Sequence, residues 1–200
     1  MKRIIFLFLI GFNINTYCQT VKQYINKGTI KVMNKDFRGA MVDFNKAIEI
    51  DPNDNDGYYY RGFAKYSLED YFGAIKDFNK SLEIDPNDNG ALSNRGSAKL
   101  ALKDYRGAMA DYNKAIEINP NNIGYYQLRA LLNETLEDYF GAIADYSEVI
   151  KIDPNDYLAY ISRGVAKLRL NQKDNACFDF SKAGELGYAK AYDMIKENCN

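Results

Sequence analysis

The sequence predicts an all-α fold in which pairs of antiparallel helices stack along the chain as a solenoid. A pattern of thirteen residues that starts with alanine and ends with proline occurs four times. Its copies end at Pro52, Pro86, Pro120 and Pro154, each 34 residues after the one before. A fixed period of this size marks a stack of similar units, none of which buries its apolar face alone. Within each copy, apolar residues recur at helical spacing.

The first residues resemble a secretory signal peptide. Two basic residues precede an apolar run, Ile4–Phe12, which is shorter than the roughly 20 residues that span a bilayer. We expect residues 1–18 to be removed after Cys18, leaving a secreted or periplasmic protein without stable membrane insertion. The alternative is a lipoprotein acylated on Cys18, although the bulky Tyr17 fits such a signal badly.

Composition argues against several functions. The 200 residues are 46% hydrophobic, and 26 Lys+Arg balance 27 Asp+Glu without a basic cluster, so a nucleic-acid partner is not expected. The lack of histidine removes the commonest general base and metal ligand. Cys18, Cys177 and Cys199 are too scattered for a zinc site. We therefore expect no metal, no cofactor and no enzymatic activity.

The second helix of each unit carries an apolar stripe and a start signal. In the second unit the stripe is Tyr71, Ala74, Ile75, Phe78 and Leu82. Aspartates directly ahead of these helices should act as N-caps. They are Asp36, Asp70, Asp104 and Asp138. In the first four units this helix stops at Asp-Pro or Asn-Pro, whereas the fifth unit has Gly187-Tyr188 there. One such turn, Asp85–Gly90, resembles a calcium loop, but its twelfth position is Gly96 instead of glutamate.

The first helix of each unit has a small residue where two helices must approach closely. These residues are Gly28, Gly62, Gly96, Ala130 and Gly164. Arginine precedes four of them: Arg61, Arg95, Arg129 and Arg163. Aspartate recurs on the second helix: Asp43, Asp77, Asp111, Asp145 and Asp179. The two sets could form a ladder for an acidic ligand, or ion pairs between the helices of a unit. We favour ion pairs, since a guanidinium matches a carboxylate.

These positions together resemble the tetratricopeptide repeat. The first unit supplies its pattern as Tyr24, Gly28, Ala40, Phe44, Ala47 and Pro52, and four more units follow in phase. The resemblance divides residues 21–188 into 21–54, 55–88, 89–122, 123–156 and 157–188. It implies a right-handed solenoid whose concave surface is lined by the first helix of each unit.

The remaining residues, 189–200, are too short for another unit and should form a capping helix. Cys177 and Cys199 lie 10 and 12 residues from the connection at Gly187, so antiparallel helices would bring them level. Disulfides are favoured in oxidising compartments. We predict a Cys177–Cys199 disulfide.

An aromatic stripe on the first helix of the second unit is the candidate ligand groove. Tyr59, Phe63 and Tyr66 share one helix face at positions that the repeat does not use for packing. Asn94 and Ser97 of the next unit offer hydrogen bonds, and Leu131 occupies the matching position in the fourth. Rigid aromatic residues often anchor interfaces. Truncating Tyr59 and Tyr66 should weaken partner capture without unfolding the protein.

Some proteins of the family hold a C-terminal carboxylate with a clamp of Lys and Asn. The matching positions here are Ile25, Thr29, Tyr60, Gly90 and Asn94, so the clamp is absent and a receptor for chaperone tails is disfavoured. We expect an exported, non-catalytic scaffold that binds a protein or peptide. The alternatives are an accessory subunit or hydrolase of envelope metabolism, and a lipid-anchored spacer.

Overall fold

A computed structural model describes residues 20–199, and these residues contain helices and turns but no strand. The predicted signal peptide, residues 1–18, lies outside the described residues. The chain divides into two compact units, one up to Asp104 and one from Tyr105 onwards. The boundary falls within the third predicted repeat, between its two helices. Each unit is described separately below.

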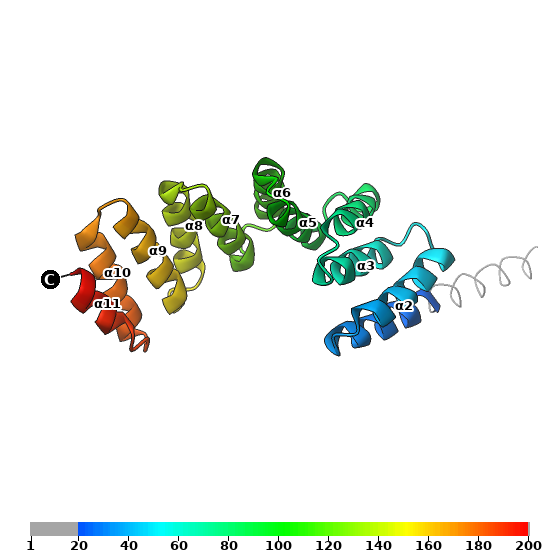
Figure 1. The fold of residues 1–200 in the computed structure, drawn as a ribbon, viewed down its shortest axis with the longest axis horizontal. Helices are drawn as coiled ribbons and strands as arrows, with labels where there is room; N and C mark the ends of the chain where they lie inside the picture. The colour runs from blue at the N-terminus through cyan, green and yellow to red at the C-terminus, as the bar shows by residue number, and fades with distance from the viewer. Residues whose placement is uncertain (1–19, 200) are drawn as a thin grey trace, which may run out of the picture. The chain divides into compact units, whose positions relative to one another are not determined.

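The described residues of the first unit, 20–104, form two helix pairs and a fifth helix, which Figure 1 shows in order along the chain. A helix over residues 20–33 is followed by α2 (Phe37–Ile50), α3 (Asn55–Ser67), α4 (Tyr71–Ile84) and α5 (Asn89–Ala101). The aromatic rings of the second helices, Phe44 and Phe78, are completely buried. A Cβ atom at Gly62 would lie 2.9 Å from the Phe78 ring, so glycine lets α3 and α4 approach closely, as predicted.

The second unit repeats the same arrangement (Figure 1). Its helices are α6 (Tyr105–Ile118), α7 (Ile123–Thr135), α8 (Tyr139–Ile152), α9 (Tyr157–Arg169), α10 (Lys173–Glu185) and α11 (Ala191–Asn198). Helix α7 pairs with α8, and α9 pairs with α10. Tyr112, Val149 and Phe180 are fully buried, so alternating helices supply the core as the apolar stripe predicts.

Aspartate side chains cap α2, α4 and α8, whereas α10 begins after Gln172 without a side-chain cap. The carboxylates of Asp36, Asp70 and Asp138 accept hydrogen bonds from the amides of Gly39, Gly73 and Gly141. These contacts confirm three of the predicted N-caps. Other Asp and Asn residues cap first helices in the same way, as the turn composition suggests. They are Asp54, Asp88, Asn122 and Asp156.

The turn inside each repeat has a backbone feature that the sequence does not signal. In this turn, one non-glycine residue per repeat has a positive φ angle: Lys35, Glu69, Lys103, Glu137 and Asn171. At Glu69 the turn ends α3 in a Schellman motif, because the Asp70 amide donates to the Lys65 carbonyl and the Glu69 amide to the Tyr66 carbonyl. The chain then reverses directly into α4.

The C-terminal helix is covalently attached to the last repeat. The sulfur atoms of Cys177 and Cys199 are bonded, and their Cα atoms are 5.9 Å apart. The structure therefore contains the predicted disulfide. Ala191 of α11 is buried in a cluster with Tyr160 and Ala183. Helix α11 thus covers the last apolar face, as expected of a cap.

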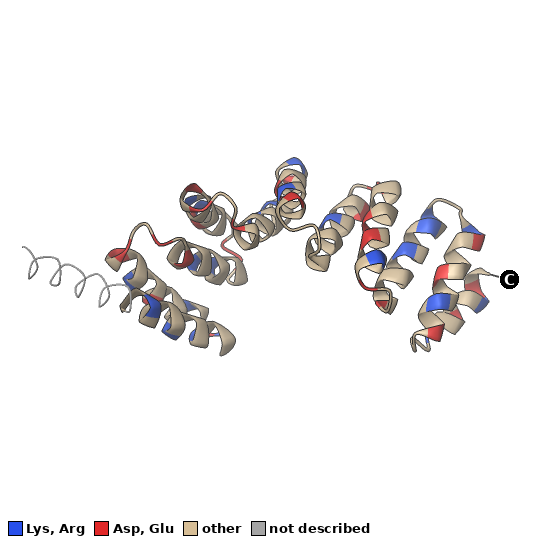
Figure 2. Cartoon of the chain, turned by 180° about the vertical axis from the view of Figure 1, so that it is seen from behind, with Lys and Arg blue, Asp and Glu red and all other residues tan. Residues whose placement is uncertain are grey.

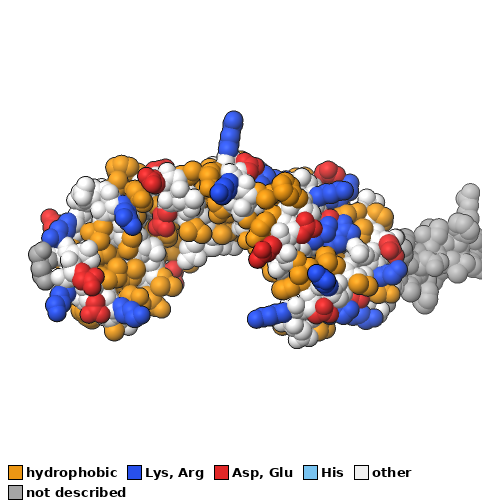
Figure 3. Space-filling model, viewed as in Figure 1, with side chains coloured by type: hydrophobic (Ala, Val, Ile, Leu, Met, Phe, Trp, Pro, Cys, Tyr) orange, Lys and Arg blue, Asp and Glu red, His pale blue; other side chains and the backbone are white. Residues whose placement is uncertain are grey.

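Charged residues of both signs are interspersed along the helices of both units (Figure 2). On the face shown in Figure 3, apolar side chains lie among charged ones, with no extended surface of a single sign. Among residues 20–199, no helix has the length and apolar character needed to cross a bilayer. The same residues contain no cluster of Cys, Asp and Glu that could hold a metal ion.

Candidate functional site

The repeated arginines and aspartates form ion pairs inside repeats. Arg61 on α3 makes two hydrogen bonds to Asp77 on α4. Its Nε donates to Oδ2 at 2.8 Å, and its Nη2 donates to Oδ1 at 2.7 Å. The same pairing joins Arg163 to Asp179 and Arg129 to Asp145. The aspartates are almost completely buried. At these three repeats, the Arg–Asp ladder is structural, as we favoured from the sequence.

Each of these arginines also contacts the preceding repeat. Arg61 Nη1 donates to Asn45 Oδ1 on α2 at 2.7 Å, and equivalent bonds link consecutive repeats elsewhere. They are Arg95–Asn79, Arg129–Asn113 and Arg163–Ser147. Three of the guanidinium groups also lie over a tyrosine ring of their own helix. This contact between repeats was not predicted, although the recurrence of asparagine at 45, 79 and 113 is a signal of it in the sequence.

A lysine one turn after the arginine gives the aspartate a second cation. Lys65 Nζ lies 2.8 Å from Asp77 Oδ2, and Lys167 Nζ lies 2.7 Å from Asp179 Oδ2. In the first repeat Lys31 pairs with Asp43 at 2.6 Å. The buried carboxylates are therefore neutralised within the fold, which leaves them unsuited to act as paired catalytic acids.

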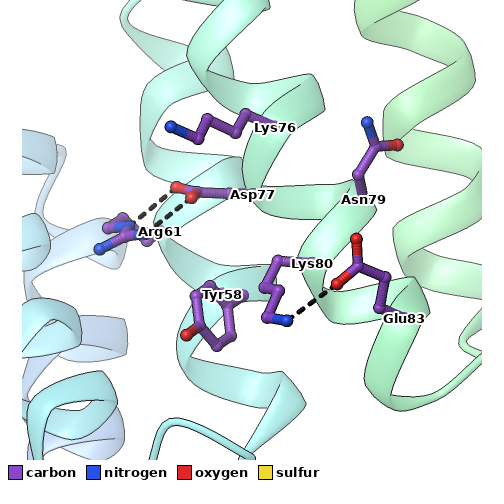
Figure 4. A pocket seen from close by; sticks show the side chains of 7 residues that line it. All are labelled: Tyr58, Arg61, Lys76, Asp77, Asn79, Lys80 and Glu83. Carbon is purple, nitrogen blue, oxygen red and sulfur yellow. Dashed lines mark hydrogen bonds and ion pairs between the residues drawn. The ribbon is translucent and has the colours of Figure 1, made fainter.

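A pocket of about 390 Å³ opens beside the Arg61–Asp77 pair (Figure 4). It is lined by Tyr58, Arg61, Lys76, Asp77, Asn79, Lys80 and Glu83. Lys80 Nζ is bound to Glu83 Oε2 at 2.8 Å, and Arg61 is held by Asp77, as Figure 4 shows. Two ion pairs therefore satisfy most of the charge in this pocket.

The predicted groove residues of the first unit lie on α3 and α5. Tyr59, Phe63 and Tyr66 on α3 are partly exposed, as are Asn94 and Ser97 on α5. The two helices lie together at the start of α5, where Asn94 Nδ2 donates to the Tyr59 hydroxyl at 3.2 Å. This hydrogen bond fixes the orientation of Tyr59 at the junction of two repeats.

The aromatic stripe is packed along one side. The Tyr59 ring stands edge-on to Tyr60, with centroids 5.0 Å apart, and is tilted over Phe78 at 6.2 Å. Tyr66 stands edge-on to Tyr71 at 5.5 Å. Burial raises the pKa of the Tyr66 and Tyr60 hydroxyls above the ordinary value. These rings are held rigidly while part of each surface remains in solvent.

The other predicted groove positions behave differently. The Ser97 hydroxyl donates to the Ser93 carbonyl of its own helix at 3.0 Å. Leu131 belongs to the second unit, on α7, and half of its surface is exposed. The positions matched to a carboxylate clamp make contacts within the fold. Tyr60 stacks on Phe44, the Thr29 hydroxyl donates to the Ile25 carbonyl, and Asn94 donates to Tyr59.

The fold and the partly exposed helix faces define a helical-repeat protein of paired helices. Family models of the tetratricopeptide repeat match residues 22–54, 56–88, 91–122 and 123–156. The chain therefore belongs to the tetratricopeptide repeat family. Comparison with curated protein sequences finds no significant match.

Solved structures share the fold over most of the chain. The crystal structure of MamA superposes with a TM-score of 0.76 at 26% identity, covering 87% of this chain and 95% of MamA. YrrB is described as a tetratricopeptide repeat protein with an unusual peptide-binding site. Its structure superposes with a TM-score of 0.71 at 19% identity, covering 90% of this chain and 97% of YrrB. The first repeat domain of Spaghetti (RPAP3), bound to the HSP90 peptide SRMEEVD, superposes with a TM-score of 0.58 at 24% identity. The match covers 59% of this chain and 94% of that domain.

Proposed function

We propose that this protein is a non-catalytic scaffold that binds a peptide or protein segment along the α3 and α5 faces. The observation that carries the proposal is the partly exposed Tyr59, oriented from the neighbouring repeat by Asn94. A ring held in this way loses little conformational freedom when a ligand packs on it, so more of the contact energy appears as affinity.

The chemistry of the surface indicates what kind of segment would bind. Tyr59, Phe63 and Tyr66 supply aromatic area, and the hydroxyl and amide groups beside them supply hydrogen bonds without charge. An extended segment with apolar side chains separated by free backbone amides suits such a surface. The peptide-binding site described for YrrB and the HSP90 peptide bound to the RPAP3 domain support a peptide as the ligand.

We also propose that the protein works outside the cytoplasm. The apolar run Ile4–Phe12 and the Cys177–Cys199 disulfide support export, since structural disulfides persist mainly in oxidising compartments. Mass spectrometry of the N-terminus from native cells tests this proposal. We expect a mature chain beginning at Gln19, whereas an acylated Cys18 would indicate the lipid-anchored form.

Site-directed photocrosslinking tests the binding surface. Phe63 is replaced by the photoreactive benzoylphenylalanine in the mature protein, and crosslinking is performed in native cells. The matched control is the same replacement at Phe72, a 76% exposed phenylalanine on α4. Both replacements extend an existing ring, so neither removes packing from the core.

The expected result is a defined partner segment crosslinked from position 63 and not from position 72. The segment is identified by mass spectrometry and then synthesised for a direct affinity measurement with the purified protein. Equal crosslinking from both positions, or none from position 63, would contradict the proposed surface.

A further inference from the structure

In three repeats, a lysine ammonium occupies one particular place beside the buried aspartate. Lys31 Nζ contacts Asp43 and also donates to the Gly39 carbonyl at 3.2 Å. Lys167 Nζ contacts Asp179 and donates to the Asn175 carbonyl at 3.5 Å. Lys65 makes the corresponding ion pair in the second repeat. The fold therefore builds a similar ammonium site in three repeats, from a carboxylate of the second helix and, for Lys31 and Lys167, a backbone carbonyl of the same helix.

The fourth repeat has the site without the lysine. The equivalent residue is Asn133, whose Nδ2 donates to Asp145 Oδ2 at 3.0 Å. Asp145 is only 2% exposed and retains a single cation, Arg129. Burial raises the pKa of the Asp145 carboxyl despite the pairing with Arg129, and the nearby Asp138 adds to this effect. The carboxylate is hydrogen-bonded but has one positive charge fewer than Asp77 or Asp179.

A pocket of about 270 Å³ opens at this place within the second unit. It is lined by Met109, Asn113, Arg129, Asn133, Asp138, Gly141, Ala144 and Asp145. Gly141 matches Gly39 and Asn175, the residues whose carbonyls bind lysine elsewhere. Ala144 leaves the mouth open, whereas the equivalent Lys76 and Phe178 are large. Two carboxylates face one guanidinium, so the lining is net negative.

We propose that this pocket binds a primary ammonium group, supplied by a lysine side chain of a partner protein. The ammonium displaces the Asn133 amide from Asp145 Oδ2 and takes the place that Lys31, Lys65 and Lys167 fill in other repeats. Met109 provides an apolar wall for the alkyl chain, since lysine buries its methylene groups and keeps its charge near solvent. Partial burial at this site makes the added ion pair stronger than one on the open surface.

The site is separate from the proposed peptide surface. Residues two positions apart on a helix point about 200° apart, so Asn133 and Leu131 face opposite sides of α7. A partner bound to the side with Leu131 therefore leaves the ammonium pocket accessible. Failure of one proposal does not imply failure of the other.

Nuclear magnetic resonance with a lysine probe tests the pocket. N-acetyl-lysine methylamide is titrated into the mature protein while the side-chain amide of Asn133 and the carboxyl carbon of Asp145 are monitored. The norleucine analogue, which lacks the ammonium, is the matched ligand control. We expect saturable shifts of both signals with the lysine probe and none with the norleucine probe. Equal shifts with both probes would overturn the proposal.

Variants and a second amine complete the test. Asn133→Lys should weaken probe binding about tenfold or more, because the new side chain fills the site as in other repeats. Asp138→Asn keeps the N-cap and should weaken probe binding up to about fivefold. The matched control is Asp70→Asn in the second repeat, which should leave probe binding unchanged. Unchanged binding in Asn133→Lys would overturn the site. If putrescine bound more tightly than the lysine probe, the assignment of the ligand as a lysine side chain would be overturned.

Discussion

Arg61 and Asn45 connect two consecutive repeats through a 2.7 Å hydrogen bond between Nη1 and Oδ1. The same guanidinium grips Asp77 of its own repeat with its Nε and Nη2 atoms. One side chain therefore fixes both the pairing of helices inside a repeat and the contact to the repeat before it. A planar guanidinium suits both contacts, because its donors point in fixed directions that match a carboxylate on one side and leave Nη1 for the amide.

Replacing Arg61 with lysine should reduce the free energy of unfolding by about 1–2 kcal/mol. The variant keeps the charge but cannot hold Asp77 and Asn45 at once. Urea unfolding of the variant and the wild type measures the difference. The matched control is Arg38→Lys on the exposed surface of α2, which should change stability by less than about 0.5 kcal/mol. Equal effects of the two changes would refute a special role for Arg61.

Much of the fold could be predicted because the repeat shows the same physical requirement several times. The positions of Gly62 and Phe78 recur every 34 residues, so each helix contact could be inferred without a structure. The positive φ of Glu69 could not, because glutamate has no preference for that conformation. The sequence also gives no signal for the boundary between the two compact units, which lies between α5 and α6.

The candidate site was predictable only in part. The pattern places Tyr59 on the exposed side of α3, but not the hydrogen bond from Asn94 that orients it. The ammonium pocket was signalled by a single break in a series, since Asn133 interrupts lysines at 31, 65, 99 and 167. That break gains meaning only when the structure shows what the lysines bind.

Stability should depend on pH through Asp145. Its folded pKa is raised above the ordinary 3.8, chiefly by burial. A raised pKa means that the folded state holds the proton more tightly, so the Asp145 contribution to the free energy of unfolding falls as pH rises from 3.8 through the folded pKa. Asn133→Lys should lower the pKa of Asp145 by adding a cation.

The difference in free energy of unfolding between Asn133→Lys and the wild type should therefore grow as pH increases from about 4 to about 7. Urea unfolding across this range measures the difference, and a carbon-13 titration of the Asp145 carboxyl measures the pKa directly. A difference that does not vary with pH would show that the second cation does not act on Asp145.

Glu69→Asn should stabilise the protein by up to about 1 kcal/mol. The φ angle of Glu69 is 63°, a conformation that costs an ordinary side chain energy and that asparagine tolerates. Asn171 already fills the equivalent position in the fifth repeat, at 57°. The reciprocal change Asn171→Glu should therefore destabilise by a similar amount. Thermal unfolding of both variants checks the pair, and shifts of the same sign would contradict the explanation.

Removing the disulfide should release the C-terminal cap. Helix α11 has eight residues and is too short to be stable alone. The crosslink between Cys177 and Cys199 contributes about 3 kcal/mol in the chain-entropy model. With both cysteines changed to serine, amide hydrogen exchange in α11 should accelerate about a hundredfold, while exchange in α3 stays the same. Unchanged exchange in α11 would show that packing alone holds the cap.

The aromatic stripe should carry most of the binding energy of the proposed partner segment. Aromatic anchors each contribute about 2 kcal/mol or more when truncated. Combining Tyr59→Ala with Tyr66→Ala should therefore weaken capture a hundredfold or more on that estimate. The control Phe72→Ala removes an exposed ring from α4 and should leave binding unchanged.

The stability of the double variant needs separate attention, because the Tyr59 ring packs against Phe78 and Tyr60. Losing that packing lowers the free energy of unfolding, so a binding defect in the double variant has to be measured at a temperature where its circular dichroism is still native. Tyr59→Phe resolves the remaining ambiguity. It keeps the ring and removes only the hydroxyl that accepts from Asn94. Retained binding in Tyr59→Phe and lost binding in the folded double variant would assign the anchor to the aromatic surface. Full binding in the folded double variant would place the partner on another face of the repeats.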